Sequence, residues 1–209
     1  MTAQSAEKLL LDEGFTFLFA PAFHPCMKYV MPARKALGIP TIFNLLGPLA
    51  NPVAPDLQVL GVGRPEFLRP MAEAILSLGV SKALVVHSRD GMDEISPQSP
   101  TDGVLVEGGK LKDILISPRD MGFSSSAADL RGGDAVENLA LLHGLLRGIS
   151  GAIHDAVVLN AGATLWLAGK TPDLAQGAIL AKETIISGHA KAYFDRWLVK
   201  AQTLSEVQN

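Results

Sequence analysis

A strand–helix–strand pattern over residues 57–87 constrains the fold of this chain more than any other feature. The apolar run at 57–62 is typical of a buried strand, and residues 65–78 form a helical pattern with Pro65 in its first turn. A second apolar run follows at 83–87. Two strands separated by one helix are parallel and are joined by a right-handed crossover. The pattern therefore predicts an α/β fold.

The residues after this unit predict how the sheet is completed. Residues 103–111 alternate between apolar and polar side chains and contain a Gly-Gly turn, so we expect a hairpin that adds an antiparallel edge. Helices that should cover the sheet are expected at 135–146, 152–168 and 174–187, with a last one reaching residue 202. The predicted fold class is α/β, with a mixed, mostly parallel sheet covered by helices and an antiparallel edge hairpin.

The first fifty residues are more varied. We expect helices at 6–12, capped by Ser5, and at 25–37, strand-like segments at 15–19 and 41–46, and irregular structure at 47–52. No repeat or polar linker divides the sequence, so residues 1–209 are expected to form one domain.

Composition excludes several classes of function. The formal charge is −3, from 18 Lys and Arg against 21 Asp and Glu, which leaves no basic surface for nucleic acid or an anionic membrane. Cys26 is the single cysteine and cannot form an internal disulfide, so the cytoplasm is the expected compartment. No apolar run approaches the ~20 residues that a membrane-spanning helix needs. We therefore expect no nucleic acid and no membrane among the partners.

An acidic segment follows the second predicted strand. Asp93 and Glu94 lie in the loop after residues 83–87, at the end of the strand where open α/β sheets bind ligands. Adjacent carboxylates suit Mg²⁺, which takes one or two of them and keeps waters and substrate phosphates. A solvated acidic turn would show the same two residues, so spacing alone leaves both interpretations open.

Three features before residue 50 could bind a small anionic substrate. His24 lies between prolines after the first strand-like segment, and Arg34 lies on the following helix, where its guanidinium could hold a carboxylate by two hydrogen bonds. Gly47-Pro48 ends an apolar run and would let a ligand approach the backbone. A loop histidine, a solvated basic face and a plain tight turn are the structural alternatives. We name no catalytic residue, because no Ser/His/Asp or Cys/His pairing follows from the sequence order.

Several segments, taken together, resemble the anthranilate phosphoribosyltransferase family. They are FLFAP at 17–21 with HP at 24–25, RKALGI at 34–39, TIFNLLGPL at 41–49, DGMDEIS at 90–96 and DAVVLNA at 155–161. The resemblance runs from about Ala6 to Trp197. It implies transfer of the phosphoribosyl group from phosphoribosyl pyrophosphate to the amine of anthranilate in tryptophan synthesis, with Mg²⁺.

The same resemblance implies roles for individual residues. Arg34 would bind the anthranilate carboxylate, His24 and Gly47-Pro48 would line the anthranilate entry, and Asp93 with Glu94 would hold Mg²⁺ against the pyrophosphate. No strong base is required, because the aromatic amine attacks as the neutral species.

The family's glycine-rich phosphate loop and its N-terminal helical domain precede the matching segments and are missing from this sequence. We therefore expect a fragment, or one part of a split enzyme that is inactive alone and needs an N-terminal partner segment, with a homodimer as the complete enzyme. Two alternative hypotheses for the function remain. The chain could be a non-catalytic relative or assembly subunit of the same fold, or a protein like the pyrimidine nucleoside phosphorylases.

Overall fold

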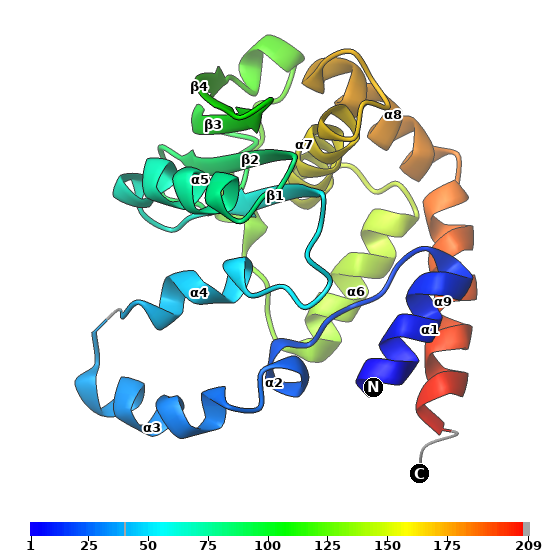
Figure 1. Ribbon diagram of the computed structural model, residues 1–209. Coiled ribbons are helices and arrows are strands. Elements are labelled where there is room, and N and C mark those ends of the chain that lie inside the picture. Colours follow the sequence, from blue (N-terminus) through cyan, green and yellow to red (C-terminus); the bar gives the residue numbers. More distant parts are fainter. Residues whose placement is uncertain (40, 207–209) are drawn as a thin grey trace. The chain divides into compact units, whose positions relative to one another are not determined.

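The computed structural model describes residues 1–39 and 41–206 of the chain. These residues divide into two compact units (Figure 1). The central unit is Ala54–Ala190, and the terminal unit combines Met1–Val53 with Lys191–Asn209. Within the described ranges, no helix combines the length and apolar character needed to cross a membrane.

The central unit is built on a four-stranded sheet. Its strands lie in the order β1 (Leu57–Gly61), β2 (Lys82–Ser88), β3 (Thr101–Glu107) and β4 (Lys110–Ile116). The sheet is mixed, as predicted, but it is not mostly parallel: β1 and β2 pair in parallel, whereas β2–β3 and β3–β4 are antiparallel. The physical reason is that only the β1–β2 connection contains a helix able to return the chain to the same end of the sheet.

The edge hairpin and the crossover helix are confirmed. Gly108 and Gly109 turn the chain between β3 and β4 with φ of 56° and 74°, a conformation that favours glycine. Between β1 and β2, a short 3₁₀ turn η1 (Pro65–Phe67) leads into α5 (Leu68–Ser77), with Pro65 in its first turn.

Three further helices belong wholly to the central unit, close to the predicted bounds: α6 (Ala135–Leu146), α7 (Ala152–Leu167) and α8 (Leu174–Ile186). Two 3₁₀ turns, η2 (Arg119–Met121) and η3 (Ala127–Leu130), precede them. α7 packs on β1 and β2 and also against α8. Fully buried side chains from β2 and α7, such as Leu84, Val86 and Leu159, form the core together with Ile95 from the β2–β3 loop.

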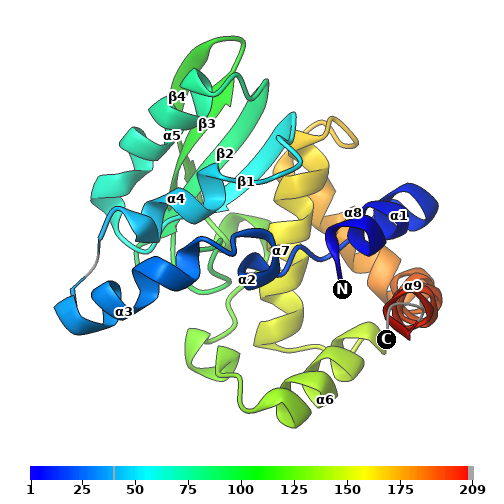
Figure 2. The ribbon, with the colours of Figure 1, turned by 60° about the horizontal axis from the view of Figure 1, so that its bottom comes forward.

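The terminal unit contains α1 (Ala3–Glu13), α2 (Ala20–Phe23), α3 (Met27–Leu37), α4 (Phe43–Leu49) and most of α9 (His189–Glu206). α1 and α9 lie side by side (Figure 2). The Tyr193 hydroxyl donates to the Glu13 carbonyl at 2.6 Å, and Trp197 Nε1 donates to the Phe15 carbonyl at 3.0 Å. These long-range bonds tie the two ends of the chain together.

Two predictions for the first part of this unit are wrong in detail. Thr2, not Ser5, caps α1, and the Ser5 hydroxyl instead donates to the Leu204 carbonyl at 3.2 Å. Residues 15–19 form no strand, because no neighbouring strand pairs with them within the described ranges.

Residues 43–49 are helical, although 41–46 was expected to be strand-like and 47–52 irregular. An apolar run of this length fits a helix as well as a strand. Pro48 sits in the last turn of α4, where the Ala50 N–H still bonds to the Leu46 carbonyl at 2.9 Å.

Candidate functional site

The β2–β3 loop carries the predicted acidic pair. Asp93 and Glu94 are both exposed, and they follow the carboxyl end of β2. The base of the loop is closed by backbone hydrogen bonds from the Ser88 N–H to the Met92 carbonyl at 2.9 Å and from the Arg89 N–H to the Pro100 carbonyl at 3.0 Å. The two carboxylates are therefore presented to solvent from a loop with a fixed base.

The electrostatics of this loop differ between its carboxylates. Although Glu94 as a residue is exposed, partial desolvation of its carboxylate, and then the adjacent charge of Asp93, raises the pKa of Glu94. The two carboxylates therefore repel each other when both are ionised. Burial alone would raise the pKa of Asp90, but hydrogen bonds from Ser96, Ser88 and the Met92 backbone together lower it. Asp90 is therefore an ionised residue that holds the loop together by hydrogen bonds within it, whereas Asp93 and Glu94 face solvent.

The donor set fits Mg²⁺ held partly by substrate. Two carboxylates are the usual protein contribution to a Mg²⁺ ion that also binds waters and phosphate oxygens. In the described ranges, no group of three or more His, Cys, Asp or Glu side chains gathers to form a complete protein cage. The remaining positions would therefore belong to water and to an anionic substrate, with Asp93 and Glu94 as the protein ligands.

The other predicted site residues lie in the terminal unit. His24 is half-buried at the C-terminal end of α2, and Gly47 and Pro48 lie inside α4 instead of in a turn. Arg34 is part of α3, but its side chain falls outside the described residues. The structure thus brings Asp93 and Glu94 together on one loop, while His24, Gly47 and Pro48 occupy two short helices of a separate unit.

Two residues contact the loop that carries the acidic pair, and the sequence did not predict this role for either of them. Asn160 on α7 hydrogen-bonds to the backbone of Ile95, which directly follows Glu94. Gly61 at the end of β1 lies so close to the Asp93 carbonyl that a Cβ there would be 1.5 Å from its oxygen. A polar residue inside the apolar run of α7 was the available signal for Asn160, whereas nothing local distinguishes Gly61.

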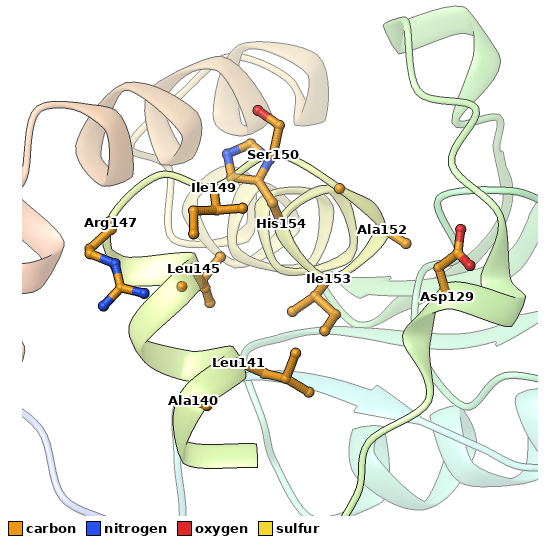
Figure 3. Close-up of a pocket in the computed structure, with 12 residues that line it drawn as sticks. Asp129, Ala140, Leu141, Leu145, Arg147, Ile149, Ser150, Ala152, Ile153 and His154 are labelled. Atoms are coloured by element: carbon orange, nitrogen blue, oxygen red, sulfur yellow. The ribbon is translucent and has the colours of Figure 1, made fainter. Parts of the chain in front are cut away.

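A separate cavity of about 440 Å³ lies between α6 and α7 (Figure 3). Leu141, Leu145, Ile149 and Ile153 gather along it. His154 also lines it and is buried, with its Nδ1 at 3.2 Å from the Asp155 carboxylate. The cavity contains none of the predicted site residues.

Fold and loop together define a class of protein. The mixed α/β sheet presents two exposed carboxylates in the loop after the carboxyl end of β2, the position at which open α/β sheets bind ligands. The chain belongs to the glycosyl transferase family: the model of that family's a/b domain matches residues 1–191.

Relatives within this family are similar over nearly the whole chain. The anthranilate phosphoribosyltransferase of Azorhizobium caulinodans is 44% identical over 199 residues, and that of Rubrobacter xylanophilus is 42% identical over 207 residues. These matches cover 95% and 98% of this chain, but only 58% and 60% of the relatives. The chain therefore spans about three fifths of the length of the curated relatives that it matches.

Solved structures give the same result. The crystal structure of anthranilate phosphoribosyltransferase from Thermus thermophilus has a TM-score of 0.85 and 42% identity, over 95% of this chain and 59% of that one. The enzyme from Saccharomyces cerevisiae, in complex with PRPP and Mg, has a TM-score of 0.89 and 29% identity, over 97% and 59%.

Proposed function

We propose that this chain is the α/β core of an anthranilate phosphoribosyltransferase, which transfers the phosphoribosyl group from phosphoribosyl pyrophosphate to the amine of anthranilate in tryptophan biosynthesis. The observation that carries the proposal is the acidic loop after β2, in a chain 44% identical to a curated enzyme of that name. On this proposal, residues 1–209 correspond to the phosphoribosyltransferase α/β domain of the family.

The acidic pair has a defined task in this reaction. The bond from the anomeric carbon to the pyrophosphate oxygen breaks, a bond from the same carbon to the anthranilate nitrogen forms, and negative charge develops on the leaving group. Asp93 and Glu94 would hold Mg²⁺ beside the pyrophosphate, where the ion supplies charge neutralisation to the leaving group. Their exposure at the loop surface supports this role, because a substrate must share the ion's coordination sphere.

The terminal unit would supply the acceptor site. Arg34 would pair with the anthranilate carboxylate, and His24, Gly47 and Pro48 would line the entry. Holding the neutral amine in line with the anomeric carbon is the main contribution required, because positioning alone removes a large part of such a barrier. After the attack the positively charged nitrogen is strongly acidic and releases its proton to water, so no dedicated base among these residues is assigned.

An N-terminal partner segment would complete the anion site. β1 is the first strand in the sheet order, so within the described ranges one of its edges pairs with no other strand. An open edge of this kind accepts a further strand. A strand added in parallel would end beside the loop that carries Asp93 and Glu94, which is where a phosphate-binding loop is needed.

The complete enzyme would act as a homodimer, with the helices of the N-terminal segment at its interface. Its substrates would be anthranilate and phosphoribosyl pyrophosphate. We also place it in the cytoplasm, which the single exposed cysteine supports.

The test is reconstitution from two parts. The purified 209-residue chain is mixed with a separately expressed N-terminal segment of the Azorhizobium caulinodans relative, and loss of anthranilate fluorescence is followed with phosphoribosyl pyrophosphate and Mg²⁺. We expect no turnover by the chain alone and turnover by the mixture.

The double variant Asp93→Asn, Glu94→Gln is the control. It should remain folded, because exposed loop carboxylates contribute little to stability, yet it should demand far more Mg²⁺. A mixture that stays inactive would overturn the proposed function, and robust turnover by the chain alone would overturn the need for a partner segment.

A further inference from the structure

The acidic loop needs a structural reason to hold its shape. It connects β2 to β3 without regular secondary structure of its own, and its two outward carboxylates repel each other. Ile95 and Ser96 directly follow Glu94, and both are fully buried. What fixes these two residues therefore also fixes the backbone that carries Asp93 and Glu94.

We propose that Asn160 is a positioning residue: its carboxamide clamps the peptide groups of Ile95 to α7 and thereby sets where the Asp93 and Glu94 carboxylates lie. The inference rests on the proposed function, which makes this pair the Mg²⁺ ligands. It concerns a residue of α7 that lies 65 positions further along the chain than Ile95.

The clamp uses the whole carboxamide. Asn160 Oδ1 accepts a hydrogen bond from the Ile95 N–H at 3.0 Å, and Nδ2 donates to the Ile95 carbonyl, also at 3.0 Å. The second Nδ2 hydrogen is directed to the Ala156 carbonyl one turn earlier on α7, at 2.9 Å. If the carboxamide were turned over, its oxygen would face the Ile95 and Ala156 carbonyl oxygens, which cannot donate a hydrogen bond. The three bonds therefore fix the orientation of the group.

Side-chain packing reinforces the clamp at the same residue. Ile95 is 0% exposed and lies in the core with Leu84, Val86 and Leu159, the last of which is the neighbour of Asn160 on α7. A residue held by its side chain in the core and by both backbone groups on a helix has little freedom. The position of Glu94 follows from it through a single peptide unit.

The loop on either side of this point is also anchored. On the N-terminal side of Ile95, the Asp93 carbonyl lies close against the backbone of Gly61 in β1. After Ile95, the Ser96 hydroxyl donates to Asp90 Oδ2 at 2.6 Å and accepts from the N–H groups of Gln98 and Ser99 at 3.0 and 3.1 Å. Asn160 is the one member of this arrangement that comes from a helix, so it couples the loop to the rigid core of the unit.

The experiment measures Mn²⁺ binding to the 209-residue chain by the electron paramagnetic resonance signal of the free ion. Asn160→Ala removes the clamp, and Asn160→Leu removes it while keeping the volume of the side chain. We expect both to raise the Mn²⁺ dissociation constant by about 10- to 100-fold, the usual effect of losing a residue that orients metal ligands. Amide hydrogen exchange at Ile95 should become faster in both.

Two variants on the same helix are matched controls. Thr164→Ala removes a side-chain bond to the Asn160 carbonyl one turn further on, away from the loop. Val158→Ala removes volume from a buried position that packs in a different cluster, and so lowers stability without touching Ile95. Both should bind Mn²⁺ as the wild type does, which separates positioning from a general loss of stability. If Asn160→Ala does not fold, the Mn²⁺ dissociation constant of Asn160→Leu tests the proposal.

The outcomes distinguish this inference from the proposed function. If Asp93→Asn with Glu94→Gln binds Mn²⁺ as well as the wild type does, the acidic pair is not the metal site, and both proposals fall. If that double variant loses binding while Asn160→Leu binds like Thr164→Ala, the positioning role is refuted and the proposed function stands.

Discussion

Gly61→Ala is the substitution whose effect follows most directly from the structure. The Cβ of an alanine at this position would lie 1.5 Å from the Asp93 carbonyl oxygen and 2.5 Å from its carbon. Both obstructing atoms are backbone, so no side-chain rotation can relieve the clash. To reach even a tight contact of about 3.0 Å, the Asp93 carbonyl must retreat by ~1.5 Å, which is overpacking of a well-packed site.

The expected cost has two parts. Overpacking destabilises the folded state by about 1–3 kcal/mol. The lower backbone entropy of the unfolded alanine variant offsets about 0.4–1 kcal/mol of this loss. We therefore expect Gly61→Ala to lower the free energy of unfolding by ~1–2 kcal/mol and to weaken Mn²⁺ binding, since Asp93 itself moves. Gly63→Ala is the matched control, because nothing lies within 4 Å of its new Cβ and its φ is not positive.

Urea unfolding followed by far-ultraviolet circular dichroism gives the free energies of both variants. Gly63→Ala should be as stable as the wild type or slightly more stable. Equal unfolding free energies for the two alanine variants, together with equal Mn²⁺ affinities, would refute the claim that β1 supports the acidic loop through contact with Asp93.

Two further predictions concern charged groups. In the reconstituted enzyme, Arg34→Ala should reduce kcat/KM for anthranilate by about 10- to 150-fold, because losing a charged hydrogen-bond partner costs roughly 1.5–3 kcal/mol; an unchanged value, equal to that of Lys35→Ala, would remove Arg34 from the site. Arg89 donates to both oxygens of Asp102 at 2.8 Å and, by these hydrogen bonds, lowers the Asp102 pKa below its ordinary 3.8. The stability from this pair is therefore present above that value and is lost as the pH falls through the lowered pKa. Arg89→Gln should move the Asp102 titration, followed by carboxyl-carbon NMR, to higher pH, and an unshifted titration would contradict the assignment.

The sequence by itself determined the elements whose signals are local. Pro65 and Gly79 bracket the helix between β1 and β2, which was predicted close to its observed bounds. Gly108-Gly109 marks the hairpin turn, although β4 continues to Ile116, beyond the predicted end of the hairpin at residue 111. The same holds for α6, α7 and α8, because glycines and Thr171-Pro172 separate these apolar segments along the chain. The acidic pair was proposed as a candidate site for a similar reason, since two adjacent carboxylates after a strand are visible in the sequence without knowledge of what surrounds them.

Only the tertiary structure decided the features that depend on distant partners. Residues 15–19 have the composition of a strand, but in the described part of the chain no strand pairs with them. Residues 43–49 are helical despite an apolar pattern that also fits a strand. The contact between Gly61 and Asp93 and the clamp from Asn160 to Ile95 join residues 32 and 65 positions apart. Such contacts arise because packing of the core brings particular backbone groups together. The sequence around one partner does not identify the other.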